Sequence, residues 1–197
     1  MRFFAQLVVA AIYATFVQNL VFSSGYGLSE AIRIARRPKY LMMYGITVTL
    51  STTLTSLFCG ILDKIPAIES LSQRWHIAVF AVVLSVLYLV SSVILLKAFR
   101  VSRKFMNSLG ICAVNTLVLA VPLVNHLAGY SLASCIGSGI GAGSAFVIAV
   151  FLINSGMRRL VSNTDIPQVF RGMPAMFAYT AMLSLAFLSF SGEAFIV

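Results

Sequence analysis

Asp165-Ile-Pro-Gln-Val-Phe-Arg-Gly-Met-Pro174 is a short polar link, and it leads into an apolar run that closes with Ser184-Leu-Ala-Phe-Leu-Ser-Phe-Ser-Gly192. The rest of the chain is equally apolar: 60% of its residues are hydrophobic and only 10% are charged. Soluble domains carry about 25% charged residues. In lipid, a backbone without strand partners satisfies its polar groups by forming helices. We therefore predict an all-α integral membrane protein.

Six segments are apolar over a length that can cross a bilayer, since a spanning helix needs about 20 such residues. The predicted spans are Phe3–Ser24, Tyr40–Leu62, Ile77–Phe99, Phe105–Ala128, Leu132–Met157 and Pro174–Ile196. The loops between them are short, as in a compact bundle. Residues 1–197 are accordingly predicted to form a single membrane domain.

The 14 lysines and arginines are distributed unevenly over the two sides of this bundle. One side holds Arg33, Arg36, Arg37, Lys39, Lys97, Arg100, Arg103, Lys104, Arg158, Arg159 and Arg171, and the other holds Arg2, Lys64 and Arg74. Clustering of this kind between apolar runs argues against a nucleic-acid-binding surface. Because basic loops stay in the cytoplasm, both termini are predicted to lie outside.

Three spans precede the central basic loop and three follow it, in halves of about residues 1–100 and 105–197. An odd number of spans makes the halves run in opposite directions, as in a 3+3 inverted repeat. The first span of each half, which is the first and fourth of the chain, is interrupted by polar residues. Such breaks mark functional centres at membrane depth, although they also relieve packing between close helices. The polar intramembrane candidates are Gln18, Asn19, Asn107 and Asn115.

Other features of the sequence favour structural interpretations. Gly137, Gly141 and Ala145 recur at four-residue spacing, which predicts a smooth helix face for close packing. Neither His76 nor His126 is expected to bind a metal, because single histidines near the membrane interface are usually boundary residues. Asp63, together with Lys64 and Glu69, is expected to be a solvated charge of an outer loop, while Cys59 and Cys135 are expected to fill space inside helices.

Several segments resemble the RnfA/NqrE family, whose members are membrane subunits of ion-translocating NADH or ferredoxin oxidoreductases. The similarity is greatest from Asp165 onward. Gln18-Asn-Leu-Val-Phe22 is similar to the family's Asn-Asn-Phe-Val-Leu, and Ile111-Cys-Ala-Val114 to its Asn-Cys-Ala-Val. Gly27-Leu-Ser29 falls where the family has Gly-Leu/Ile-Cys. The resemblance independently implies termini outside the cytoplasm.

The resemblance also implies a cofactor. In the family, one cysteine from each broken span joins two from a sister subunit to hold a [2Fe–2S] cluster, and four thiolates are the usual ligand set. Cys112 matches one of these positions, but the other is occupied by Ser29. A serine alkoxide forms far less readily than a thiolate, so the resemblance predicts either an altered cluster or a changed redox role.

By resemblance, we expect a subunit of an Rnf- or Nqr-type complex in the bacterial cytoplasmic (inner) membrane. Its partners would be a sister subunit of inverted topology and subunits that carry flavin and iron–sulfur groups. It would help electrons to cross the membrane, with coupled movement of Na⁺ or H⁺, and would not be catalytic alone. Two alternatives remain open from the sequence: an inverted-repeat carrier for an ion or small molecule without redox chemistry, and a scaffold subunit.

Overall fold

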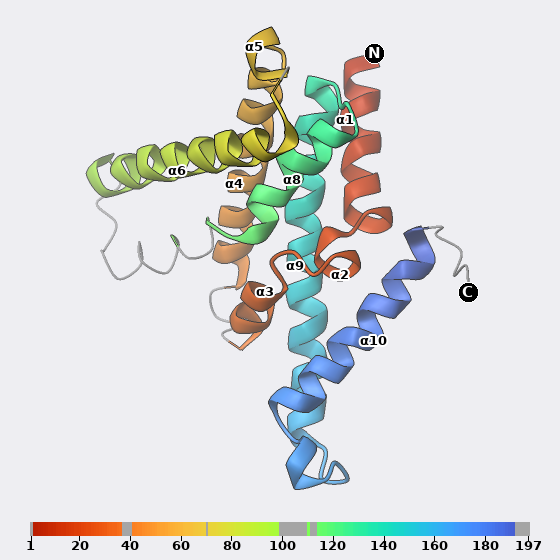
Figure 1. The fold of residues 1–197 in the computed structure, drawn as a ribbon. Helices are drawn as coiled ribbons and strands as arrows, with labels where there is room; N and C mark the ends of the chain where they lie inside the picture. Colours follow the sequence, from red (N-terminus) through yellow and green to blue (C-terminus); the bar gives the residue numbers. More distant parts are fainter. Residues whose placement is uncertain (1, 37–40, 70, 99–109, 111–113, 192–197) are drawn as a thin grey trace.

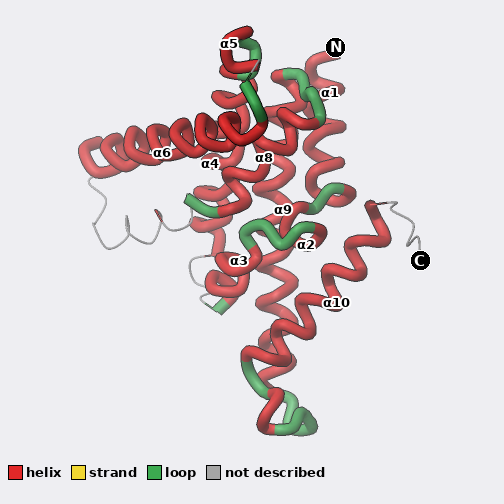
Figure 2. Tube along the Cα trace, in the orientation of Figure 1, coloured by secondary structure: helices red, strands yellow, loops and turns green. Residues whose placement is uncertain are grey.

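The computed structural model of the chain describes residues 2–36, 41–69, 71–98, 110 and 114–191. Throughout this part of the chain the regular elements are helices, with no strand (Figures 1 and 2). They are α1 (Arg2–Ile12), a π-helical turn (Tyr13–Val17), α2 (Leu20–Ser23), α3 (Leu28–Ala35), α4 (Leu41–Leu62), α5 (Pro66–Glu69), α6 (Gln73–Ala98), α8 (Thr116–Leu127), α9 (Leu132–Ser162), a 3₁₀ turn (Gln168–Phe170) and α10 (Met173–Ser191). The predicted all-α class is confirmed.

Five of the predicted spans have helical counterparts that are long and apolar enough to cross a membrane within the described residues. They are Arg2–Ser23, Leu41–Leu62, Arg74–Ile94, Leu132–Leu160 and Met173–Phe190. The predicted fourth span is represented by α8, an apolar helix of only 12 residues. Most of that span's first half lies outside the described residues, so the sixth crossing remains a prediction.

Helix α9 runs through the middle of the molecule (Figure 1). It contacts α1 and α4 along two faces that contain glycines. On one face, a Cβ added to Gly137 would lie 2.2 Å from the carbonyl oxygen of Leu7 in α1. On the other, a Cβ added to Gly139 would lie 2.6 Å from Cα of Thr53 in α4. The predicted smooth face is therefore confirmed, and a second face is present beside it.

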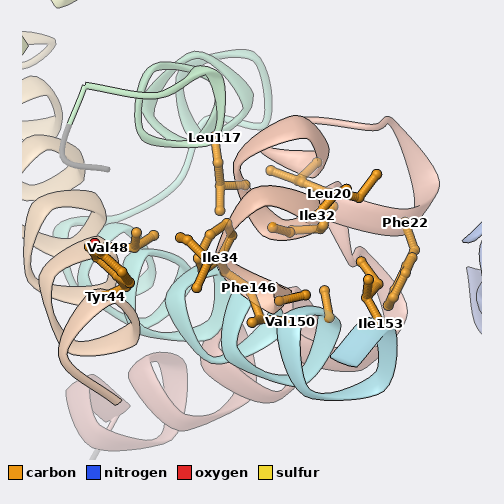
Figure 3. Packing of buried hydrophobic residues seen from close by; sticks show 14 of the residues in the cluster. Leu20, Phe22, Ile32, Ile34, Tyr44, Val48, Leu117, Phe146, Val150 and Ile153 are labelled. Atoms are coloured by element: carbon orange, nitrogen blue, oxygen red, sulfur yellow. The ribbon is translucent and has the colours of Figure 1, made fainter. Parts of the chain in front are cut away.

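The main hydrophobic core lies where the short helices α2 and α3 pack against α9, α4 and α8 (Figure 3). Phe146, Val150 and Ile153 of α9 are each no more than 1% exposed, and they meet Ile32 and Ile34 from α3. Burying an aliphatic or aromatic side chain stabilises a fold by about 1.5–3 kcal/mol in water, but in lipid close van der Waals packing is the relevant term. This packing holds the irregular segment between α1 and α4 in place.

Helix α6 departs from the compact bundle that the short loops predicted. Figure 1 shows it crossing α4 and α8 near its beginning and then extending away from the other helices. Only 11% of its most apolar stretch is buried. Because α6 packs against little of the chain, its direction is set mainly by the contacts of its first turns with α4 and α8.

Candidate functional site

The first span is broken where the sequence predicted. The π-helical turn ends at Val17, and α2 begins at Leu20 after the two-residue break of Gln18 and Asn19. The Asn19 side chain is 1% exposed: its Nδ2 donates to the carbonyl of Thr15 (3.1 Å), and its Oδ1 accepts from the backbone N–H groups of Val21 and Phe22 (both 3.2 Å). This asparagine is an N-cap, and it satisfies backbone groups that lipid could not.

The last helical part of the fourth span begins in the same way. Asn115 has an extended backbone, is buried, and accepts a 2.9 Å hydrogen bond at Oδ1 from the backbone N–H of Val118 in α8. An asparagine cap thus begins α2 in the first span and α8 in the fourth. Matching asparagine caps are what an inverted repeat of the two halves of the chain would produce, but the repeat itself remains a prediction.

The two broken spans meet at a contact that we call the junction, formed by Gly27 and Thr116. The backbone N–H of Gly27 donates a 2.9 Å hydrogen bond to Oγ1 of Thr116. Gly27 has φ of +74°, and a Cβ there would lie 3.0 Å from Cβ of Leu117. From the junction, α3 and α8 run away toward opposite ends of the molecule (Figure 1). Both N-terminal ends therefore point toward the same region, where they favour negative charge.

The predicted ligand residues lie next to this junction in sequence. Ser29 is exposed in the first turn of α3, and its Oγ donates a 2.7 Å hydrogen bond to Oε2 of Glu30. Cys112 lies outside the described residues, four positions before Thr116. Asn107 lies outside them as well, and Gln18 is half-buried in the first break. The structure therefore places Gly27, two positions before Ser29, in contact with Thr116, while the position of Cys112 remains undescribed.

A second group of polar side chains lies at the other end of α8, and here the sequence-based interpretation was wrong. His76 and His126 were expected to be separate boundary residues, and Asp63 a solvated charge. Instead the three side chains lie together, and His76 is 1% exposed. They come from the end of α4, the first turn of α6 and the last turn of α8, and no local spacing indicates that these ends meet.

A buried polar network beside this group was also missed by sequence reasoning. Asn125 of α8 donates through Nδ2 to Oγ of Ser56 in α4 (2.7 Å) and accepts at Oδ1 from Oγ of Ser138 in α9 (2.7 Å). Oγ of Ser56 also donates to the carbonyl of Cys135 (2.6 Å), and Oγ of Ser138 lies 3.1 Å from the same carbonyl oxygen, so its one proton is shared between two acceptors. The network joins three helices. Cys135 and Cys59 are buried free thiols, in agreement with their predicted role as packing residues.

Comparison with known proteins connects this architecture to one family. Residues 7–193 match the family model described as "Rnf-Nqr subunit, membrane protein". The chain is 26% identical over 191 residues to the A subunit of the Na⁺-translocating ferredoxin:NAD⁺ oxidoreductase complex of Acetobacterium woodii. That alignment covers 94% of this chain and 97% of the relative.

Two further relatives have related names. The A subunit of the proton-translocating ferredoxin:NAD⁺ oxidoreductase complex of Clostridium ljungdahlii is 27% identical, over 92% of this chain and 94% of its own length. The A subunit of the ion-translocating oxidoreductase complex of Rhodobacter capsulatus is 26% identical, over 89% and 91%. All three similarities extend along most of the chain, and the family match over residues 7–193 includes Gln18, Asn19, Gly27 and Thr116.

Proposed function

Because the chain belongs to the Rnf-Nqr family of membrane subunits, we propose that it is a membrane-embedded subunit of an Rnf-type, ion-translocating oxidoreductase complex. It is a multi-pass membrane protein. In this proposal it helps electrons to cross the bilayer, together with a sister subunit of inverted topology and subunits that carry flavin and iron–sulfur groups. The observation that carries the proposal is the match to the family over residues 7–193.

The junction supports an electron-transfer role at membrane depth. The N-terminal ends of α3 and α8 meet at Gly27 and Thr116, and each end presents backbone N–H groups and the positive end of a helix dipole. Such ends stabilise bound anions. A thiolate-ligated iron–sulfur group carries negative charge, so this surface provides an electrostatic environment suited to one.

Of the two positions that would ligate an iron–sulfur cluster, Cys112 has suitable ligand chemistry and Ser29 does not. Cys112 offers a thiol, the ligand type that [2Fe–2S] clusters use. The Ser29 hydroxyl carries a proton that it donates to Glu30, and a neutral hydroxyl is a poor substitute for a thiolate. We therefore propose Cys112 as this chain's thiolate ligand to a [2Fe–2S] cluster shared with the sister subunit. Such a cluster, when bound, would accept and release single electrons.

We propose that the protein lies in the cytoplasmic (inner) membrane of a bacterium, and the distribution of its basic residues supports an orientation with both termini outside. Among the described residues, Arg33 lies in α3, while Arg158 and Arg159 lie near the end of α9. In Figure 1 these segments occupy the end of the molecule opposite to the N-terminus. By the positive-inside rule, that end is cytoplasmic.

The hydrogen bonds at the break in the first span argue against the alternative that the protein is a carrier. A polar solute site needs side chains with unused hydrogen-bonding groups, yet the Asn19 amide makes three bonds within its own segment. The scaffold alternative predicts assembly without a role in electron flow, and the following experiment distinguishes it.

The test is purification of the tagged chain from its native membranes, followed by identification of the bound proteins and assay of ferredoxin-dependent NAD⁺ reduction. We expect flavin- and iron–sulfur-carrying subunits to co-purify and the activity to be lost when the chain is deleted. Assembly that persists with unchanged activity after Cys112→Ala would favour a scaffold. Purification as a single species that binds a solute, without redox partners, would favour a carrier.

A further inference from the structure

We propose that Asp63, His76 and His126 form a binding site for a divalent transition-metal ion, with Zn²⁺ as the best-suited ion. The proposal is independent of the electron-transfer role of the junction. One side chain comes from each of three elements: Asp63 directly follows α4, His76 lies in the first turn of α6, and His126 lies in the last turn of α8. Two imidazoles and a carboxylate are a common set of protein ligands for zinc.

The separations suit a single ion. Oδ2 of Asp63 lies 3.1 Å from Nδ1 of His126, and Oδ1 of Asp63 lies 3.8 Å from Nε2 of His76. One ligand atom from each residue lies within 4.8 Å of the other two. In a tetrahedral zinc site with bonds of about 2.0–2.1 Å, neighbouring ligand atoms are about 3.3–3.4 Å apart. Small side-chain movements therefore complete the site, with water as a fourth ligand.

The hydrogen bonding of His76 indicates where a cation would bind. Its Nδ1 lies 3.3 Å from the carbonyl oxygen of Ser72, and a carbonyl only accepts, so Nδ1 carries the proton. In the neutral ring, Nε2 then presents a lone pair toward Oδ1 of Asp63, 3.8 Å away. Both atoms are buried without a hydrogen-bond partner. Two facing acceptors repel each other, and a metal ion between them would satisfy both. A backbone carbonyl on the other ring nitrogen is also the usual support for a metal-bound histidine.

The two imidazole rings are packed closely against each other and against Phe80. The rings of His76 and His126 stack with centroids 3.9 Å apart, and Phe80 packs its ring against both at 5.9 and 6.1 Å. Side-chain exposure is 17% for Asp63 and 22% for His126, so an ion can enter from that side. The nitrogen ligands favour Zn²⁺ over Mg²⁺ or Ca²⁺, which prefer oxygen ligands.

Metal binding here would anchor α6. This helix is little buried within the chain, and His76 is close to the point where it meets α4 and α8. An ion held by all three residues would tie the beginning of α6 to the ends of its two neighbours. Its binding energy would then contribute to the stability of this end of the domain.

The test uses the full-length chain purified with its partner subunits, titrated with Zn²⁺ after chelator treatment. Zinc content and zinc-edge X-ray absorption are compared for wild type, His76→Gln, Asp63→Asn and the control Asp165→Asn, which makes the same change at an exposed carboxylate. We expect one zinc per chain in wild type and in the control. Its shell should contain two imidazoles with oxygen and no sulfur.

Each ligand variant should weaken zinc binding by at least about tenfold, the lower bound for loss of even an outer-shell partner. The midpoint of thermal unfolding should rise with zinc in wild type and in Asp165→Asn only. Equal zinc binding by all four proteins would overturn the proposal, as would the absence of bound zinc in wild type. If the ligand variants do not assemble, the wild-type absorption spectrum still decides, because a sulfur-containing shell or one without two imidazoles contradicts the site.

Discussion

The backbone N–H of Gly27 donates a 2.9 Å hydrogen bond to Oγ1 of Thr116, across 89 positions of sequence. This bond joins the two broken spans at the point where α3 and α8 begin. Thr116 contributes a hydroxyl at the start of α8. The backbone of Gly27 is in the left-handed region, which glycine adopts most readily. The junction therefore depends on the chemistry of both positions.

Thr116→Val should destabilise the chain by about 1–3 kcal/mol, because the partly buried N–H of Gly27 loses its acceptor while the side chain keeps its shape. The measurement is chemical unfolding in detergent. Thr47→Val is the matched control, because Oγ1 of Thr47 donates to the carbonyl of Met43 within its own helix, at 2.9 Å. Equal loss of stability in the two variants would show that the hydrogen bond between Gly27 and Thr116 contributes no more to stability than a bond within one helix.

Gly139→Ala tests whether close packing or helix propensity dominates at the glycine faces of α9. Alanine favours an exposed helix by about 1 kcal/mol over glycine, but its Cβ would lie 2.6 Å from Cα of Thr53. We expect net destabilisation of about 1–3 kcal/mol from overpacking, seen as a lower unfolding midpoint. Ser144→Ala, on the same helix at a half-buried position, should change it little. A rise in the Gly139→Ala midpoint would contradict the contact with α4.

Local pattern was sufficient to predict much of this fold. Hydrophobic runs located the helices, four-residue spacing located the first glycine face, and Gln18-Asn19 located the break in the first span. The resemblance directed attention to Ser29 and Cys112, which are close to Gly27 and Thr116 in the sequence. Each of these signals lies within a few consecutive residues.

The polar groups around the end of α8 could not be predicted in this way. Asp63, His76 and His126 come from three helix ends, and Asn125 acts through Ser56 and Ser138 on two other helices. Their partners are set by how α4, α6, α8 and α9 pack, which no single segment encodes. The direction of α6 could likewise not be predicted, because its apolar sequence specifies a helix without specifying which helices it packs against.

Asn125→Ala should destabilise the chain by about 1–3 kcal/mol, because two buried side-chain hydrogen bonds are lost. Both serine hydroxyls would retain the carbonyl of Cys135 as an acceptor, which keeps the loss within this range. Thermal unfolding in detergent measures the effect. Asn163→Ala is the control for the same substitution at an exposed position at the end of α9, and a comparable shift there would contradict the importance of the network.

The proposed orientation predicts the behaviour of reporter fusions. A reporter active only outside the cytoplasm should be active when fused after Val197 and inactive when fused after Lys104, because basic loops remain in the cytoplasm. Both fusion points lie outside the described residues, so the test rests on the charge distribution alone. The reverse pattern would contradict the orientation and the relation to the RnfA/NqrE branch of the family.

Cys112→Ala should abolish iron and acid-labile sulfide assigned to the shared cluster, together with its paramagnetic resonance signal in the reduced complex. The reason is the difference in ligand chemistry: a free cysteine titrates at about 8.5 and yields a thiolate near neutral pH, whereas the Ser29 hydroxyl retains its proton. Ser29→Cys should make the cluster more resistant to loss, because it restores a second thiolate.

Cys59→Ala and Cys135→Ala are the matched controls, since both thiols are buried in helices away from the break. They should lower the unfolding midpoint through lost packing and leave the iron content unchanged. Wild-type spectra and activity in Cys112→Ala would instead make Cys112 an ordinary packing residue. Electron transfer through this protein would then have to proceed without a ligand from the fourth span.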